Sequence, residues 1–274
     1  MGPDMRKNTT PDDRHCRPTR RAVVTGLAAV LAAPPLIGRA VAAPDLAGYE
    51  AILNAHVVAG ADGLNRVRYG DLKRQALAGL AAYIAQLQGV RASALPPGEQ
   101  KVFWINLYNA KTLQIVAENY PVTSIKDINL GNGFFGRGPW KAKLLRLEGR
   151  DLSLDNIEHD ILRQKFNEPL IHYALNCASV GCPNLQKQAY RAATLEQQLQ
   201  AGARAYVNHR RGLSVNGNRL TASKIYRWYA ADFGGAAGLS RHWVAYAAPK
   251  LKNQLSALGS VARYVYDWSI NDAG

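Results

Sequence analysis

The chain has 274 residues, 47% of them hydrophobic and 20% charged, and a formal net charge of +14 at pH 7. A chain of this length and apolar content can bury a sizeable core, which favours one large domain or two closely packed lobes. No long polar tract occurs, and this excludes wholesale disorder. The positive charge suits anionic partners. After residue 43, however, there is no run of five basic residues and no nucleic-acid-binding motif, so nucleic acid is not an expected partner.

The first 43 residues have the features of an export signal. Arg20-Arg21 precedes an apolar run over residues 22–37, and the small residues of 40–43 suit a signal peptidase. A twin arginine before a weakly hydrophobic run is typical of a bacterial Tat signal, and a Sec signal or an uncleaved anchor is the alternative. The run is too short and too interrupted by Gly and Pro to predict a membrane-spanning helix. We therefore expect a domain over residues 44–274, without a transmembrane segment, in the periplasm or outside the cell.

The patterning of this domain predicts helices and short strands without regular βαβ alternation. Helices are expected over residues 46–58, 72–87, 99–119, 153–163, 194–207, 223–232 and 240–246. Strands are expected over residues 67–69, 140–147, 170–177, 213–221 (as a hairpin) and 261–268. The mixture predicts an α+β fold with a central buried helix packed on a small, largely antiparallel sheet.

Short polar motifs predict where several of these elements begin or turn. Asp71 and Ser153 are placed to cap helices. Thr194 with Gln197 three residues later has the pattern of a capping box. Asn216-Gly217 favours a type I′ turn in the hairpin.

The helix expected over residues 99–119 is apolar nearly all round, which indicates a position at the centre of the domain. Asn106 and Asn109 lie on one face of it because they are three residues apart. An unsatisfied buried amide costs about 1–3 kcal/mol, so both side chains need partners. They either tie down a neighbouring loop, or orient a catalytic group or donate to an oxyanion.

The segment over residues 171–183 carries both cysteines that remain once the export signal is removed. An apolar, β-prone run brings His172 towards Cys177, and a loop of small residues follows as far as Cys182. On a regular strand His172 and Cys177 point to opposite faces, so they meet only if the strand bends or ends before the thiol. The backbone N–H groups of residues 178–181 offer an oxyanion site.

Four stretches resemble the Domain of Unknown Function 547 family over most of the exported part. They read FWINLYNA at 103–110, LSLDNIEH at 152–159, IHYALNCASVGCP at 171–183, and SKI, WY and DFG between 223 and 234. The resemblance implies homology but no particular reaction, because no general activity is attached to the family.

The order of a buried helix with Asn and then a strand with His also resembles, in outline, the transglutaminase and papain superfamily. Those enzymes place their cysteine at the start of the central helix. Here that helix has no cysteine, and the thiol follows the His segment instead. A link to that superfamily implies a rearranged or lost site.

These residues favour thiol-dependent hydrolysis or acyl transfer. Cys177 is the expected nucleophile, with His172 or His159 as its base, because a reactive thiol needs an adjacent base. Glu158 supplies a carboxylate beside His159, and Asn106 is expected to orient a partner. No cofactor is expected.

Several further residues of the same motifs are expected to contact the substrate: Asn109, Trp104, Ser179, Tyr226 and Trp228. A peptide, a glycan or a small molecule is the expected ligand. The two histidines and two cysteines of the site are ligand types that suit zinc, but they lack a diagnostic spacing, so no metal site is predicted.

The alternative is a non-catalytic binding module. An even pair of cysteines in an exported protein favours a disulfide, here Cys177–Cys182. Aromatic loops would then recognise a peptide or a glycan: Phe134-Phe135, Trp140 and Trp228-Tyr229.

Overall fold

The computed structural model describes residue 44 and residues 46–130, 138–258 and 260–274. The predicted export signal and the pair Phe134-Phe135 lie outside the described residues. Val41–Gly274 forms one compact unit. Across the described ranges, no helix has both the length and the hydropathy needed to cross a bilayer.

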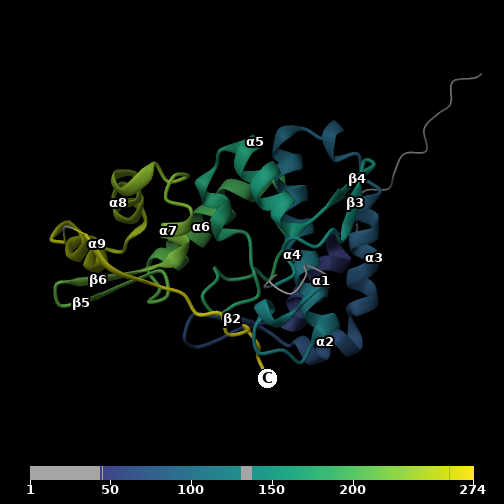
Figure 1. Ribbon diagram of the computed structural model, residues 1–274, viewed down its shortest axis with the longest axis horizontal. Helices are drawn as coiled ribbons and strands as arrows, with labels where there is room; N and C mark the ends of the chain where they lie inside the picture. Colours follow the sequence, from purple (N-terminus) through teal and green to yellow (C-terminus); the bar gives the residue numbers. More distant parts are fainter. Residues whose placement is uncertain (1–43, 45, 131–137, 259) are drawn as a thin grey trace, which may run out of the picture. The chain divides into compact units, whose positions relative to one another are not determined.

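The first part of this unit is a group of helices around one buried helix (Figure 1). Its elements are α1 (Leu46–His56), α2 (Tyr69–Gln75), α3 (Leu77–Gln88) and α4 (Pro97–Asn119), with the 3-10 turns η1 (Ala92–Ala94) and η2 (Ile125–Asp127). Most residues of α4 are buried, and α2, α3 and the later helix η3 pack against it. The predicted central buried helix is therefore confirmed.

The strands form three small sheets rather than one. Two are antiparallel pairs, β1 (Val57–Ala59) with β2 (Asn65–Val67) and β3 (Leu145–Leu147) with β4 (Arg150–Leu152). In the third, β6 (Arg219–Ser223) pairs antiparallel with β5 (Leu213–Asn216) and parallel with β7 (Val261–Val265). Mixed helices and small sheets confirm the α+β class.

The second half of the chain supplies the remaining helices, and Figure 1 shows α8 and α9 beside the hairpin β5–β6. These elements are η3 (Asn156–Arg163), α5 (Gln164–Phe166), η4 (Pro169–Tyr173), η5 (Ala192–Thr194), α6 (Leu195–Val207), α7 (Lys224–Trp228), α8 (Gly235–Tyr246) and α9 (Pro249–Ser256). Of these, α9 was not predicted, although Pro249 at its first turn is a typical helix start.

The prediction of a strand over residues 170–177 is wrong, because residues 169–173 form the 3-10 helix η4. The Glu168 side chain accepts the Leu170 N–H, and Pro169 occupies the first turn, which starts a helical turn. Leu170 to Tyr173 are all buried, and a short apolar run fits a buried turn as well as a buried strand. His172 and Cys177 therefore do not lie on opposite faces of a strand.

The helix predicted over residues 72–87 is two helices. The break falls at Ala76, whose φ is −131°, and Asp71 lies inside α2 instead of capping it. The apolar spacing continues on both sides of Ala76, so the sequence pattern does not indicate the break. The strand predicted over residues 140–147 is formed only by its last three residues, as β3.

The hairpin over residues 213–221 is confirmed, but its turn lies one residue later than predicted. Asn216 pairs with Arg219, so Gly217 and Asn218 form the turn, and of these only Gly217 has a positive φ, +55°. This pattern fits a type II′ turn and not type I′. The capping box before α6 is also not formed, since Thr194 makes no side-chain cap hydrogen bond.

The C-terminal tail after β7 ties the two parts of the unit together. The Val180 N–H donates to Ser269 O at 2.8 Å, and the Asn271 N–H donates to Ala178 O at 3.1 Å. The Val67 N–H of β2 in turn donates to Asn271 O at 2.8 Å. The tail therefore runs along the loop that contains both cysteines.

Candidate functional site

Two amide side chains hold the loop that carries both thiols. Asn109 on α4 donates from Nδ2 to Ala174 O at 2.8 Å and accepts the Asn176 N–H at 2.9 Å. Asn176 donates from Nδ2 to Pro183 O at 2.7 Å and accepts the Ala178 N–H at 2.9 Å. Asn109 was predicted to contact substrate, and the structure places its amide behind the loop, where it fixes the backbone.

The two thiols are adjacent and not bonded to each other. The Cys177 backbone N–H donates to Cys182 Sγ at 2.9 Å. The Tyr266 hydroxyl lies 3.0 Å from Cys177 Sγ and 3.3 Å from Cys182 Sγ. Ser179 Oγ lies 2.9 Å from the same hydroxyl and 3.3 Å from Cys177 Sγ. Cys177 is half-buried and Cys182 is buried, so Cys177 is the more accessible thiol.

The surroundings of the two thiols give them different pKa values. Burial raises the pKa of Cys182, but hydrogen bonds from the Cys177 thiol, the Tyr266 hydroxyl and the Cys177 N–H outweigh it and lower the pKa to about 7. The pKa of Cys177 lies well above its usual value, because its proton is hydrogen-bonded to Cys182 and because it is desolvated. At neutral pH the pair therefore tends to keep one proton, on Cys177.

The expected oxyanion site over residues 178–181 is not formed by the backbone. The Ala178 N–H is taken by the Asn176 side chain. The N–H groups of Val180 and Gly181 donate to backbone carbonyls of the C-terminal tail at 2.8 Å each. Three of these four backbone donors are therefore already occupied.

Both thiols open on a cavity of about 220 Å³, called the thiol cavity below. Its walls are mainly aromatic and contain three titratable side chains from η3 and η4 in addition to the thiols. The lining residues are Tyr108, Trp140, Asp155, Glu158, His159, His172, Leu175, Cys177, Cys182, Ile225, Trp228, Tyr229, Tyr266 and Trp268. The structure thus brings together Cys177, both candidate bases and Glu158, as the sequence predicted, and adds Trp228 from the expected substrate contacts.

His172 is held by an acidic partner that the sequence reasoning did not assign to the site. Its Nε2 lies 2.8 Å from Asp232 Oδ2, and Tyr229 stacks on the imidazole with a ring separation of 3.9 Å. Arg163 binds the same carboxylate through Nε at 2.6 Å and Nη2 at 2.8 Å. Arg163 and then His172 hold the pKa of Asp232 well below its usual value. The imidazole is therefore fixed in one orientation, with Nδ1 as its second nitrogen.

The second candidate base lies on η3, which is a π-helix. The Nδ1 of His159 lies 3.1 Å from Arg163 Nη1, and because guanidinium groups only donate, this nitrogen accepts. Glu158 is buried and accepts the Tyr108 hydroxyl at 3.2 Å. π-helical turns are rare and occur frequently at functional sites. This turn directs two adjacent residues, Glu158 and His159, to one cavity.

Three of the predicted site residues lie elsewhere. Asn106 makes a pair of 2.9 Å hydrogen bonds with the backbone N–H and O of Tyr190, so it ties down a loop. Trp104 is buried edge-on against Phe103, at 4.9 Å between ring centroids. Tyr226 is fully buried and accepts a hydrogen bond from another tyrosine. The remaining expected contact, Ser179, touches Cys177 Sγ but does not line the cavity.

Sequence reasoning missed Asp232, Arg163 and Tyr266 as parts of the site, and it named Tyr229 only as a ligand contact of the binding-module alternative. Asp232 and Tyr229 lie in the fourth family-like stretch, which was the available signal, whereas Tyr266 belongs to no motif. Among the residues that the structure describes, no group of three or more His, Cys, Asp or Glu side chains is arranged to hold a metal ion.

The fold and site define an α+β protein with an aromatic-lined thiol cavity next to a His–Asp pair. Residues 92–207 match the family model described as "Protein of unknown function, DUF547", so this segment of the chain belongs to that family. The matched part contains both thiols and His172, while Asp232 and Tyr266 follow it. No curated protein and no solved structure matches the chain.

Proposed function

We propose that this protein is a thiol-dependent hydrolase or acyl transferase in which Cys177 is the nucleophile. The observation that carries the proposal is that the Cys177–Cys182 pair and the Asp232-held His172 line the same cavity. A thiol next to a proton acceptor, with a separately oriented imidazole, is the arrangement that nucleophilic acyl transfer requires.

Cys182 is the proton acceptor for the attacking thiol. Its pKa of about 7 means that it carries the thiolate charge near neutral pH, and it is hydrogen-bonded to the Cys177 thiol. As Cys177 Sγ attacks an acyl carbon, its proton passes to Cys182, and a thioester forms on Cys177. The bond to the leaving oxygen or nitrogen breaks, and that atom takes the proton that Cys182 has just received, so Cys182 is again a thiolate.

Water or an acceptor amine or alcohol completes the reaction. It loses a proton to His172 as it attacks the thioester, and the acyl group leaves as an acid, amide or ester. The Cys177 sulfur regains its proton from His172, which restores the starting state of all three groups. Asp232 acts by holding His172 through Nε2, as the carboxylate does in triads of this type.

The size of the cavity limits the group that is bound next to the thiols. Ligand sites for drug-sized molecules usually have about 300–1,000 Å³, whereas the thiol cavity has about 220 Å³. Trp228 is 45% exposed at its wall, where it can contact the rest of a longer substrate. A short acyl group on a peptide, a glycan or a small molecule fits this space.

Acylation by an activated ester tests the proposal. We expect p-nitrophenyl acetate to leave one acetyl group on Cys177, detected by intact mass and peptide mapping, and Cys177→Ala to abolish it. His172→Gln should slow acyl transfer by about 10²-fold, a usual contribution of general acid–base catalysis, and His159→Gln, at the other candidate base in the same cavity, should slow it less. Equal losses in the two variants would contradict the role given to His172.

A structural disulfide remains the second candidate, favoured by one observation, that both sulfurs lie within 3.3 Å of the same Tyr266 hydroxyl. Under that interpretation the protein is a binding module in which a disulfide closes the loop of residues 177–182, called the thiol loop below. The intact mass of the exported protein with and without reductant separates the two. A difference of about two hydrogens would establish the disulfide and exclude a free Cys177 nucleophile.

A further inference from the structure

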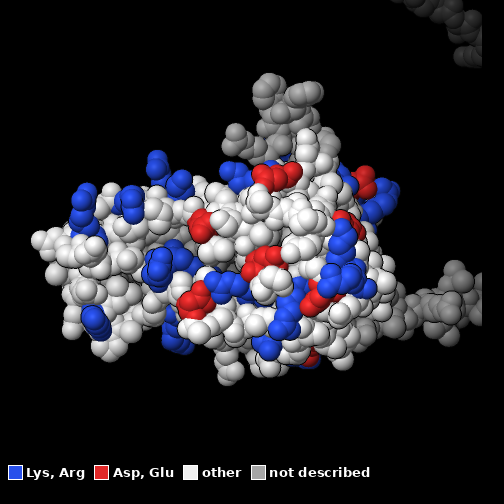
Figure 2. All heavy atoms as spheres, turned by 90° about the horizontal axis from the view of Figure 1, so that it is seen from below, with Lys and Arg blue, Asp and Glu red and all other residues white. Residues whose placement is uncertain are grey.

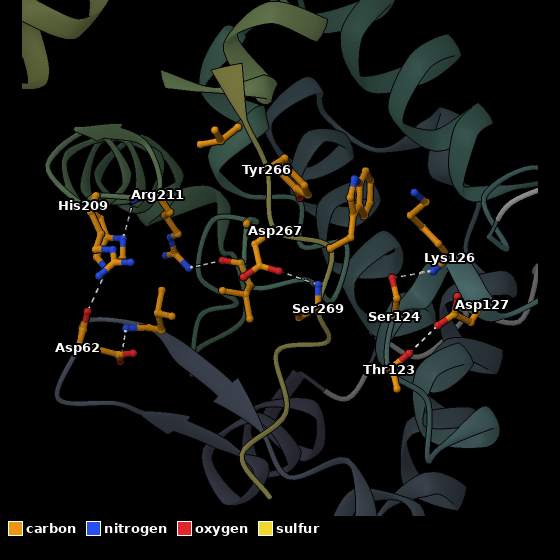
Figure 3. Close-up of a pocket in the computed structure, with 16 residues that line it drawn as sticks. Asp62, Thr123, Ser124, Lys126, Asp127, His209, Arg211, Tyr266, Asp267 and Ser269 are labelled. Atoms are coloured by element: carbon orange, nitrogen blue, oxygen red, sulfur yellow. Dashed lines mark hydrogen bonds between the residues drawn. The ribbon is translucent and has the colours of Figure 1, made fainter. Parts of the chain in front are cut away.

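A second cavity, of about 1110 Å³, also borders the thiol loop, at Val180 and Gly181, and Figure 3 shows residues that line it. Its walls come from the β1–β2 loop, the segment around η2, the thiol loop, the turn between α6 and β5, and the C-terminal tail. Tyr266 and Trp268 line both this cavity and the thiol cavity. The function proposed above makes no use of it.

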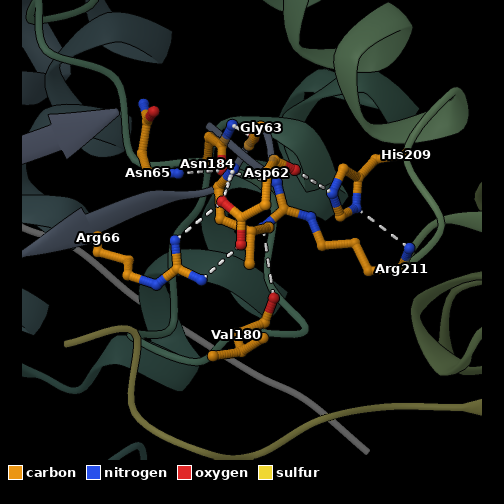
Figure 4. Close-up of polar contacts among 9 residues, drawn as sticks. Asp62, Gly63, Asn65, Arg66, Val180, Asn184, His209 and Arg211 are labelled. Atoms are coloured by element: carbon orange, nitrogen blue, oxygen red, sulfur yellow. Dashed lines mark hydrogen bonds and ion pairs between the residues drawn. The ribbon is translucent and has the colours of Figure 1, made fainter. Parts of the chain in front are cut away.

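Arg211 is the central cation of this second cavity. Its Nη2 donates to Asn184 Oδ1 at 2.6 Å and its Nη1 to Val180 O at 3.3 Å, which Figure 4 shows as two neutral contacts. Its Nε is buried and has no hydrogen-bond partner. Burial lowers the pKa of Arg211, and over residues 46–130, 138–258 and 260–274 no carboxylate forms an ion pair with it. The Tyr206 ring, whose centroid lies 5.4 Å from Arg211 Cζ, offsets part of the cost of desolvating the guanidinium, and an anion bound to it would offset more.

Asp62 and His209, which also line this cavity, do not neutralise the charge of Arg211. Asp62 is already bound by Arg66 through both oxygens, at 2.9 and 2.6 Å. His209 accepts the Arg211 backbone N–H at Nδ1, and its Nε2 lies 2.9 Å from Asp62 O, which assigns it a neutral ring that donates from Nε2. Figure 4 shows this arrangement around the guanidinium.

Lys126 supplies a second cation at the opposite side of the cavity (Figure 3). Its ammonium lies 5.1 Å from the ring centroid of Trp268, and in the described part of the chain it has no carboxylate within ion-pair distance. Besides Asp62, two further acids, Asp127 and Asp267, line the cavity, as does a third cation, Arg210, and these three residues are exposed. Asp127 accepts the Thr123 hydroxyl at 2.8 Å, and Asp267 accepts the Ser269 N–H at 2.9 Å.

The surrounding surface adds a positive field. Residues 205–265 contain nine Lys and Arg but only one acidic residue, Asp232, and that carboxylate is bound by Arg163. At the left end of Figure 2, where β5, β6 and α9 lie, the visible face carries Lys and Arg without Asp or Glu. Such a charge distribution raises the local concentration of anions near the cavity.

We propose that the second cavity binds an oxyanion, the carboxylate or phosphate group of a ligand, through Arg211, with Lys126 as the opposing cation. Arg211 has free donors of the fork geometry that recognises planar or tetrahedral oxyanions. Because Tyr266 and Trp268 separate this site from the thiols, a bound anion lies next to the thiol loop. The anion site does not depend on the thiol chemistry.

Calorimetric titration of the full exported protein tests the site, with inorganic phosphate and succinate as separate probes at constant ionic strength. We expect saturable binding of at least one probe with a stoichiometry of one, and which probe binds more tightly identifies the class of oxyanion. Arg211→Met keeps the aliphatic stem and should weaken binding by about 10–100-fold, the value of a charge-assisted hydrogen bond. Lys126→Gln should weaken it by about 3–10-fold.

Arg219→Gln is the matched control, because it removes the same charge from an exposed position on β6 outside the cavity. It should change the affinity by less than about twofold. No saturable binding of either probe would overturn the proposal, and so would an equal loss in Arg219→Gln and Arg211→Met, which would indicate diffuse attraction. If Arg211→Met does not fold, the affinities of Lys126→Gln and Arg219→Gln are compared instead. An equal loss of affinity in these two variants would likewise overturn the proposal. Cys177→Ala should bind the probes normally, so failure of the thiol proposal leaves this result intact.

Discussion

The backbone N–H of Cys177 donates to the sulfur of Cys182 at 2.9 Å, across a loop of four residues. This contact stabilises a thiolate on Cys182, while the Cys177 thiol provides a further hydrogen bond to it. The two sulfurs therefore titrate as a pair, and the first proton leaves near pH 7. The more accessible thiol, Cys177, is the one that keeps its proton.

Thiolate formation should thus depend on Tyr266, whose hydroxyl contacts both sulfurs. We expect the thiolate absorbance of the native protein to rise with a midpoint near pH 7, the pKa of Cys182. Tyr266→Phe removes one donor to the charged sulfur and should raise this midpoint by roughly one pH unit. Tyr264→Phe, two residues earlier in β7, is the control and should leave it unchanged. An unaltered midpoint in Tyr266→Phe would show that the phenol does not stabilise the thiolate.

Asp232 should stabilise the fold as well as orient His172. Asp232→Asn weakens the bonds to Arg163 and His172 in a partly buried network, and we expect a loss of about 1–3 kcal/mol in the free energy of unfolding at pH 7. The folded-state pKa of Asp232 is depressed, so this stability is present above the unfolded pKa of about 3.9 and decreases as the pH falls below it. Urea unfolding at pH 7 and pH 3 should show a smaller gap between native protein and variant at pH 3. A gap that is constant with pH would contradict the ionic role.

How far the site could be predicted depends on the kind of signal each residue carries. Cys177, His172, Glu158 and His159 were found because their side-chain chemistry and motif spacing suggested a site, and the structure gathers all four around one cavity. Asn106 has the same polar character, yet it binds the Tyr190 backbone. Polarity on a buried helix predicts that a partner exists, but it does not identify the partner.

The parts that could not be predicted depend on long-range packing. Asp232 contacts His172 across 60 residues of sequence, and Tyr266 contacts Cys177 across 89. No local sequence pattern indicates either contact. The same is true of η4, where the capping carboxylate of Glu168 and the ring of Pro169 start a turn that apolar spacing cannot tell from a strand. The central helix was predictable because its apolar residues encircle it, which only a fully buried helix tolerates.

The loop that carries the thiols should depend strongly on Asn109. Asn109→Ala leaves the buried Ala174 carbonyl and the Asn176 N–H without their partner, at a cost of about 1–3 kcal/mol for each unsatisfied group. Urea unfolding should therefore show a large loss of stability, and Cys182 should alkylate faster than in the native protein because the loop opens. Asn119→Ala is a matched control at the end of the same helix, where the amide bonds only to Ile115 O within α4. It should cost less than about 0.5 kcal/mol, and similar losses in both variants would contradict a special role for Asn109.

His242 should set a second, separate dependence of stability on pH. Burial lowers its pKa to about 4, and its Nε2 lies 2.6 Å from the Tyr173 hydroxyl. The folded state therefore resists protonation of this ring, while the unfolded chain accepts a proton near pH 6.5. The stability associated with neutral His242 is present above about pH 6.5 and is lost as the pH falls towards about 4.

Replacement by a residue that does not titrate should remove this dependence. In His242→Gln, the free energy of unfolding should fall less between pH 7 and pH 4.5 than it does in the native protein, even if the variant is less stable at pH 7. His209→Gln gives a comparison at a ring whose pKa is also lowered by burial, but which lies beside the second cavity and not against Tyr173. Parallel curves for His242→Gln and the native protein over this range would show that His242 is protonated in the folded state as readily as in the unfolded chain. Because Asp232 acts only below about pH 4, the two contributions can be measured in one titration series.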